Sequence, residues 1–330
     1  MLRIHFSSED LARTLLAEAP DPFWEVVLSA HLLLRMRGSE ALLGPWKQAL
    51  LEQLPVGSRL RAEIEPLIAI NPNKGYFPDL LTPAESAEGW EAGVEALLSL
   101  PRRRLRQEIG RVGDEQGHLD VVTTDLAEGR AEGVKQLAAA VRTYHNTAVA
   151  PIAERIRAAF EADRALRAQA FLTGGIAGVL NGLHPNATFH GSVLELSDVH
   201  PDEDIHLNGR GLRLVPSFFK QTETKLLTLA DPELPQVLVY PVSRSAGLPA
   251  AAAREPLAAL LGRTRAALLE QTANQGSTSE LARRVAISPA AASQHLSVLR
   301  VAGLVSSTRT GNTVRHHLTP LGQAVLSGGA

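Results

Sequence analysis

The sequence contains no cysteine among its 330 residues, and it has only two methionines and three tryptophans. Without a thiol the chain forms no disulfide, cysteine-ligated zinc site, iron–sulfur cluster or thiol nucleophile. Long apolar runs are also missing, because glycines and Asn181 interrupt the most apolar stretch, 170–183, which is too short to span a bilayer. An acidic pair, Glu9-Asp10, stands where a secretory signal is apolar. We therefore expect a soluble cytoplasmic protein with no membrane partner.

Motifs of several enzyme classes are absent as well. The sequence has no nucleophile elbow, no P-loop, no dinucleotide-binding glycine pattern and no HExxH pair. The glycine-rich stretch 174–178 does not follow a predicted strand, so we interpret it as close helix packing rather than as a phosphate site. We predict that the chain is not an enzyme and that it needs no cofactor.

The charge is unevenly distributed along a chain of ordinary globular composition. Hydrophobic residues make up 45% and charged residues 21%, which argues against disorder, and the length suits about two domains. Residues 257–330 hold seven arginines against Glu270 and Glu280, a net charge of +5, whereas residues 1–256 hold 26 basic and 33 acidic side chains, a net charge of −7. A basic C-terminal part on an acidic body is typical of a protein that meets nucleic acid at one end.

Residues 1–242 are predicted to form an N-terminal domain, helical to about residue 182 and continuing as a small antiparallel sheet over about 183–242. Helical spacing and capping residues predict helices at 11–16, 23–34, 82–99, 125–145 and 151–170. Short apolar runs bounded by turn residues predict strands at 192–196, 205–207, 212–219, 226–229 and 237–240. Asn208-Gly209 between two of these strands is typical of a β-hairpin. Residues 243–255 have the composition of a linker.

Residues 256–330 have the pattern of a winged helix-turn-helix domain. A helix over 257–272 precedes a capping box, Ser277 to Glu280, which opens a short helix over 278–285. Ser288 caps a third helix that begins at Pro289 and ends at Gly303. Two strands, 304–309 and 313–318, then form a hairpin, and a short final helix follows. The predicted fold class is therefore mixed α and β. Residues 289–302 form the second helix of the helix-turn-helix and are the predicted recognition helix.

The recognition helix has one apolar face and one face of small or polar residues without an acid. Small side chains let a helix enter the major groove, Gln can bond an adenine edge twice, and Ser can bond bases or phosphate. Arginines of the hairpin and the helix end supply attraction to phosphate. The residues predicted to bind DNA are Thr278, Ser288, Ala290, Ala291, Ser293, Gln294, Ser297, Arg300, Arg309, Asn312, Thr313 and Arg315.

Several of these residue types stand at the fixed offsets of a known family. Ser279-Glu-Leu-Ala, the run from Ile287 to Leu296, the run from Leu299 to Val305 and a hairpin turning at Gly311 resemble the winged helix of ArsR-type transcriptional regulators. The resemblance implies a homodimer that binds a two-fold symmetric operator in double-stranded DNA and represses transcription. It also implies that the helices at 257–272 and 319–326 make the dimer.

The family's usual metal sites are missing from this sequence. In metal-sensing members of the family that this sequence resembles, metal is bound by cysteines in the helix before the turn or by Asp and His on the final helix. The matching stretch 280–284 has no thiol, and 321–326 has neither Asp nor His. Metal sensing therefore does not carry over, and we predict no metal site.

The N-terminal part also resembles a family region, but one that implies no activity. The stretches 3–6, 9–13, 215–219 and 238–241 resemble the long N-terminal region of a subset of actinobacterial ArsR-like regulators. Two interpretations stay open: a sensor domain for a small-molecule effector, and a dimerisation or protein-docking scaffold without a ligand. An enzyme fused to a DNA-binding module is a third and weaker one. An apolar pocket between helices, with some of the large aromatic residues as walls, would favour the sensor.

Histidines and acids also crowd into residues 184–206. They are His184, His190, Asp198, His200, Asp202, Glu203, Asp204 and His206. Such side chains are possible metal ligands, but we favour a solvated acidic loop between two strands.

Overall fold

The computed structural model describes residues 1–34, 43–72, 76, 78–116, 124–197, 202–221, 234, 236–242, 257–258, 260–272, 276–310 and 313–326. At residues 116, 309, 310, 313, 320, 323 and 324 it describes only the backbone. The chain divides into two compact units, Met1–Val242 and Ser243–Ala330, which we call the N-terminal unit and the C-terminal unit. The linker predicted at 243–255 lies outside the described residues.

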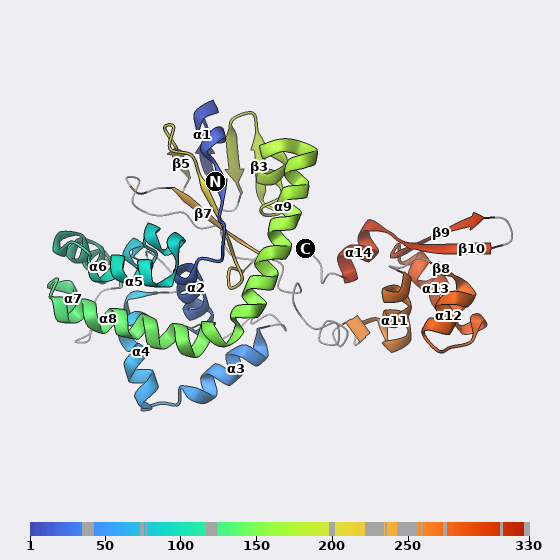
Figure 1. The fold of residues 1–330 in the computed structure, drawn as a ribbon, viewed down its shortest axis with the longest axis horizontal. Helices are drawn as coiled ribbons and strands as arrows, with labels where there is room; N and C mark the ends of the chain where they lie inside the picture. The colour runs from blue at the N-terminus through green and yellow to red at the C-terminus, as the bar shows by residue number, and fades with distance from the viewer. Residues whose placement is uncertain are drawn as a thin grey trace. The chain divides into compact units, whose positions relative to one another are not determined.

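The N-terminal unit combines helices with two small sheets (Figure 1). Its described helices are α1 (Ser8–Arg13), α2 (Pro22–Leu34), α3 (Gly44–Gln53), α4 (Arg59–Ile70), α5 (Trp90–Leu98), α6 (Arg102–Gln116), α7 (Thr124–Ala127), α8 (Ala131–Tyr144) and α9 (Ala153–Asn181). Shorter helical turns are η1 (Asp79–Leu81), η2 (Ala84–Glu88), η4 (His145–Val149) and η5 (Ala150–Ile152). Its strands are β1 (Leu2–His5), β2 (Leu15–Leu16), β3 (Ala187–His190), β4 (Val193–Leu196), β5 (Glu203–His206), β6 (Arg213–Ser217) and β7 (Val237–Pro241).

The two sheets join segments that lie far apart in the sequence. The four-stranded sheet has the order β3-β4-β1-β5, in which only the β1–β5 pair is parallel. The three-stranded sheet has the order β2-β6-β7 and is parallel throughout. The start of the chain is therefore built into both sheets.

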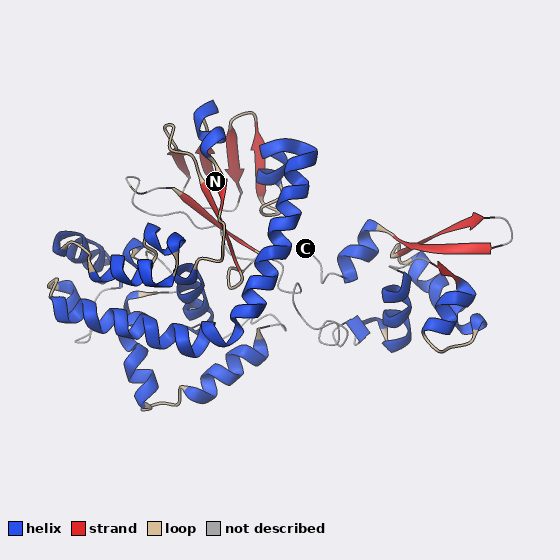
Figure 2. Cartoon of the chain, in the orientation of Figure 1, coloured by secondary structure: helices blue, strands red, loops and turns tan. Residues whose placement is uncertain are grey.

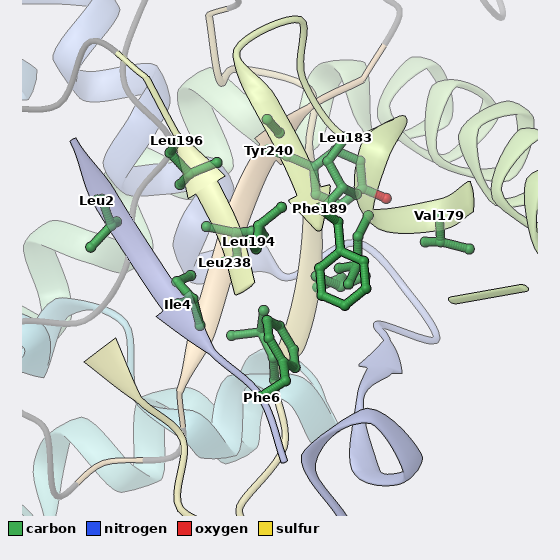
Figure 3. Packing of buried hydrophobic residues seen from close by; sticks show 14 of the residues in the cluster. Leu2, Ile4, Phe6, Val179, Leu183, Phe189, Leu194, Leu196, Leu238 and Tyr240 are labelled. Carbon is green, nitrogen blue, oxygen red and sulfur yellow. The ribbon is translucent and has the colours of Figure 1, made fainter. Parts of the chain in front are cut away.

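An apolar core lies between the two sheets and the end of α9. It includes Leu2 and Ile4 of β1 and Phe6 just after it, together with Leu194 of the four-stranded sheet and Tyr240 of the three-stranded sheet (Figure 3). Buried Leu2 and Ile4 alternate with the less buried Arg3 and His5, as expected of a strand with one face in the core. Burial of such side chains stabilises the unit by about 1.5–3 kcal/mol each.

The predicted mixed α and β fold class is confirmed, but the predicted pairing of the strands is partly wrong. Asn208 and Gly209 do adopt positive φ angles, 54° and 81°. The strands on either side nevertheless separate, because β5 pairs with β1 and β6 pairs with β2 and β7. The antiparallel prediction holds for β3, β4 and β1 only, and the strand predicted at 226–229 lies outside the described residues.

Several predicted helices have different limits. The helix predicted over 11–16 is wrong beyond Arg13, since Leu15–Leu16 form β2 beside β6. The helix predicted over 82–99 is a short 3-10 turn, η2, that ends at Gly89 with φ of 124° before α5 begins. Helix α2 lies where the apolar run 23–34 predicts it.

Helix α9 is longer than predicted and is bent. At Gly175 the backbone leaves the helix, with φ of 59° and ψ of −154°. A Cβ atom at Gly174 or Gly175 would meet no atom within 4 Å, so close helix packing is the wrong interpretation of these two glycines. At Gly178 a Cβ atom would lie 2.5 Å from the Ala170 carbonyl oxygen, so close packing does apply at that position.

Two buried carboxylates hold α2 in place, and one of them joins it to the parallel sheet. Asp21 caps α2 by accepting hydrogen bonds from the backbone N–H groups at its start, and it also accepts one from the Ser86 hydroxyl. Glu25 accepts hydrogen bonds from the Ser217 hydroxyl and from the N–H groups of Phe218 and Phe219 at the end of β6. Burial raises the pKa of Glu25 to about 7, against the lowering effect of these bonds.

The C-terminal unit contains the described elements α11 (Arg263–Thr272), β8 (Gly276–Ser277), α12 (Thr278–Arg284), α13 (Pro289–Val301), β9 (Val305–Thr310), β10 (Thr313–Leu318) and α14 (Pro320–Leu326). The strands form one sheet with the order β8-β10-β9. Figure 2 shows the β9–β10 hairpin beside the helices of this unit. Within the described residues, no helix of either unit is long and apolar enough to cross a membrane.

Candidate nucleic-acid interface

Helix α12 begins at a complete capping box. The Ser277 hydroxyl accepts a hydrogen bond from the Glu280 N–H, and the Glu280 carboxylate accepts one from the Ser277 N–H at 2.8 Å. Hydrogen bonds from Ser277 to this carboxylate lower the pKa of Glu280. The helix gives way to a tight turn in which Ala286 has φ of 57°. The turn directs the chain into α13, as the helix-turn-helix pattern predicts.

Helix α13 has the limits that its capping residues predict. The Ser288 hydroxyl accepts a hydrogen bond from the Ala291 N–H at 3.2 Å, and Pro289 occupies the first helical position. Gly303 ends the helix in the left-handed region, with φ of 74°. Ala292, Leu296 and Leu299 are buried among the helices of this unit, so the opposite face of α13 is fixed toward the outside.

The outward face of α13 consists of small and polar residues. Ala290, Ser293, Gln294 and Ser297 are all exposed. The side chains of Ser293, Gln294 and Ser297 form no hydrogen bond with any residue that the structure describes. These groups are therefore free to bond base edges or phosphate, as a recognition helix requires.

The hairpin carries one of the arginines predicted to bind DNA, Arg315, next to the start of α12. Arg315 is exposed on β10, where it pairs in register with Thr308 of β9 and Ser277 of β8. Arg300 is exposed in the last turn of α13. Asn312 lies outside the described residues, and the side chains of Arg309 and Thr313 lie outside them too.

Three predicted residues have structural partners or limited exposure. The Thr278 hydroxyl lies 2.9 Å from Nε2 of His316, and Nδ1 of the same ring lies 2.9 Å from the Ser307 hydroxyl. Ser288 caps α13, and Ala291 is half-buried. The structure therefore brings the polar residues of α13 together on one face. The side chains of Thr278 and Ser288 instead form hydrogen bonds within the domain. Contact of all twelve predicted residues with DNA stays a prediction.

Two features of the interface have no counterpart in the sequence prediction. Strand β8 adds a third strand to the hairpin by pairing with Arg315 and His316 of β10, and it is too short for any periodicity to indicate it. Arg283 is exposed in the last turn of α12 and adds positive charge next to the turn. Its signal is visible in the sequence, in the Arg283-Arg284 pair that ends the helix.

The histidine-rich segment of the N-terminal unit forms hydrogen bonds and a ring stack. Asp204 lies 2.6 Å from Nε2 of His5, whose ring stacks on His206 with centroids 4.4 Å apart. Asp198 and His200 lie outside the described residues. Among the described side chains, no group of three or more His, Asp or Glu could hold a metal ion.

A family model described as a helix-turn-helix domain matches residues 260–308. The match covers α11, the helix pair α12–α13 and most of β9, where the geometry above places the candidate interface. No curated protein and no solved structure matches the chain. The C-terminal unit therefore contains a helix-turn-helix domain, which supports a DNA-binding transcription regulator.

Proposed function

We propose that the protein is a transcriptional repressor of the ArsR winged-helix type that binds a two-fold symmetric operator as a homodimer. The observation that carries the proposal is the outward face of α13, where exposed Ser293, Gln294 and Ser297 have no partner in the described chain. A helix with this face enters the major groove and reads base edges, with Gln294 as the main candidate for an adenine contact.

Exposed arginines supply the sequence-independent part of binding. Arg300 at the end of α13 and Arg315 on β10 are the described members of this set. Lysine and arginine contacts to phosphate release counterions, so the affinity of such a protein falls steeply with salt. The net charge of +5 over residues 257–330 fits this role.

Apolar side chains left in solvent support the homodimer. Leu260, just before α11, is 78% exposed, and Leu321 on α14 is 54% exposed. Both lie in the segments, 257–272 and 319–326, that the family resemblance assigns to the dimer. Large exposed apolar side chains near both ends of one domain favour burial against a second copy.

Selection of binding sites from random double-stranded DNA by the full-length chain tests the proposal. The expected result is one enriched motif made of two inverted half-sites, with centres about 10 base pairs apart or a multiple of that spacing, and two chains per duplex. The same motif placed over a promoter should reduce transcription in a purified system. An enriched motif without symmetry, bound by one chain, would contradict the dimer, and no enriched motif would contradict the whole proposal.

A further inference from the structure

A pocket of about 370 Å³ lies between the end of α2 and the helices α3 and α4 in the N-terminal unit. Most of its wall is aliphatic, formed by Leu33, Leu34, Leu51, Leu54, Ile64 and Ile68. Its volume lies within the range of small-molecule sites, about 300–1,000 Å³. None of the described residues that line it is aromatic, so its described wall lacks the aromatic side chains that the sequence suggests for a ligand pocket.

Part of the apolar wall is open to water. Leu54 and Ile64 are buried, but Leu51 is 48% exposed and Leu34 is 38% exposed. Apolar side chains that stay exposed around a concave surface are typical of a binding site rather than of a finished core. An apolar ligand body would cover them.

Arg61 brings a positive charge to this apolar wall. It lies in the first turn of α4, as does Arg59, whose Nε is bonded to Glu63 Oε1 at 2.7 Å. Arg61 stands in the same i,i+4 relation to Glu65, yet within the described chain no ion pair joins these two residues. The guanidinium of Arg61 is therefore available to an anion at the pocket that it lines.

The start of α4 adds to this positive potential. The helix is capped by the Ser58 hydroxyl, which accepts a hydrogen bond from the Arg61 N–H, and its first turn contains no acid. The N-terminal end of a helix favours a negative charge nearby. Glu65 also lines the pocket, one turn farther along, so the anionic group belongs at the Arg61 end.

We propose that this pocket binds an amphipathic small molecule with an apolar body and one carboxylate or similar anionic group. The apolar body packs on Leu54, Ile64 and their neighbours, and the anion meets Arg61 and the start of α4. Binding of this molecule at the pocket does not depend on the proposed function. Its consequence, a change in DNA affinity that makes the molecule an effector, rests on the proposed function.

Calorimetric titration of the full-length chain with octanoate tests the site. We expect saturable binding of one octanoate per chain, at least about fivefold tighter than 1-octanol or octyltrimethylammonium, as an exposed ion pair provides. Arg61→Gln should reduce octanoate affinity about fivefold. Arg59→Gln is the matched control and should bind as the unmodified chain does, because Arg59 is paired with Glu63 and does not line the pocket.

A second pair of variants separates charge from apolar contact. Leu51→Asp and Leu51→Lys remove the same exposed side chain from the wall and leave opposite charges, so octanoate should bind the Lys variant about fivefold more tightly. Leu98→Asp changes a leucine of nearly equal exposure, 49%, on α5 outside the pocket, and should leave binding unchanged. Thermal unfolding of each variant verifies that it is folded.

Three results would overturn the site: no octanoate binding, equal binding of the three compounds, or equal losses in Arg61→Gln and Arg59→Gln. DNA affinity measured with and without octanoate then tests the consequence. Octanoate that binds without changing DNA affinity overturns the effector role and leaves the repressor intact. A chain that binds octanoate but no DNA overturns the proposed function and leaves the site intact.

Discussion

The Nε2 atom of His316 lies 2.9 Å from the hydroxyl oxygen of Thr278, and this bond joins the hairpin to the first turn of α12. The other ring nitrogen of His316 meets the Ser307 hydroxyl on the neighbouring strand. A neutral imidazole has one donor and one acceptor, so one hydroxyl accepts and the other donates. The ring thereby fixes how β9 and β10 lie against the helix-turn-helix.

Acid should weaken the C-terminal unit through His316. Burial, with smaller effects of His317 and Arg300, lowers the pKa of His316 below its ordinary value of 6.5. The unfolded chain therefore binds this proton more tightly than the folded unit, and stability is lost as pH falls below 6.5. NMR titration of the ring should give a pKa below 6.5, and a pKa above that value would contradict the buried neutral ring.

Gln294→Ala should reduce specificity more than general affinity. Loss of a bidentate base contact costs about 1–3 kcal/mol on the preferred site and less on random DNA. Binding measured on both duplexes gives the difference, with Gln271→Ala on α11 as the control. Equal losses on the two duplexes would remove Gln294 from base reading.

Arg315→Ala should weaken binding to every sequence by a similar factor. Because a phosphate contact releases about one counterion, the slope of log affinity against log salt should fall by about one unit. Arg157→Ala, an exposed arginine of α9 paired with Glu154, is the control in the N-terminal unit. A slope that stays the same would exclude Arg315 from the phosphate contacts.

Glu25 should make the stability of the N-terminal unit depend on pH. Its folded pKa of about 7 lies above the ordinary value of 4.5, so the folded unit binds the proton more tightly. The stabilising effect is present below pH 4.5 and is lost as pH rises through 7, by about 3 kcal/mol in all. Unfolding in guanidinium, followed by tryptophan fluorescence at both ends of this window, measures the change.

Glu25→Gln removes the titrating group and should flatten this pH dependence. All three tryptophans, Trp24, Trp46 and Trp90, belong to the N-terminal unit, so their fluorescence reports on that unit alone. The exposed Glu18→Gln is the control. A variant that keeps the full pH dependence would assign it to another group.

Local features of the fold could be predicted from the sequence because neighbouring residues determine them. The capping box at Ser277, the cap at Ser288 and the left-handed Gly303 all depend on residues within one turn. Pairing of β1 with β4 depends instead on residues almost two hundred positions away. The alternation of Leu2, Ile4 and Phe6 indicates a strand, but it does not indicate a partner.

The hairpin prediction at Asn208-Gly209 shows the same limit. Both residues adopt the positive φ angles that such a turn needs. The strands beside them then pair with different sheets, because β1 and β2 from the start of the chain offer alternative edges. The residues of the turn determine its backbone conformation, but they do not determine which strands its two neighbours pair with.

The candidate interface divides in the same way. Helical spacing alone places Ser293, Gln294 and Ser297 on one face, and that face is exposed in the structure. The role of Thr278 depends on His316, 38 positions later, which reaches it only when β10 lies against α12. A side chain that looks available for DNA in the sequence is therefore bonded within the protein.

Sequence-specific recognition by α13 is tested most directly by the affinity of the full-length chain for its selected DNA site and for a scrambled duplex, from about 50 mM to about 200 mM salt. We expect tighter binding to the site at every salt concentration and a steep fall in both affinities as salt rises. Equal affinity for the two duplexes throughout would contradict sequence-specific recognition by α13.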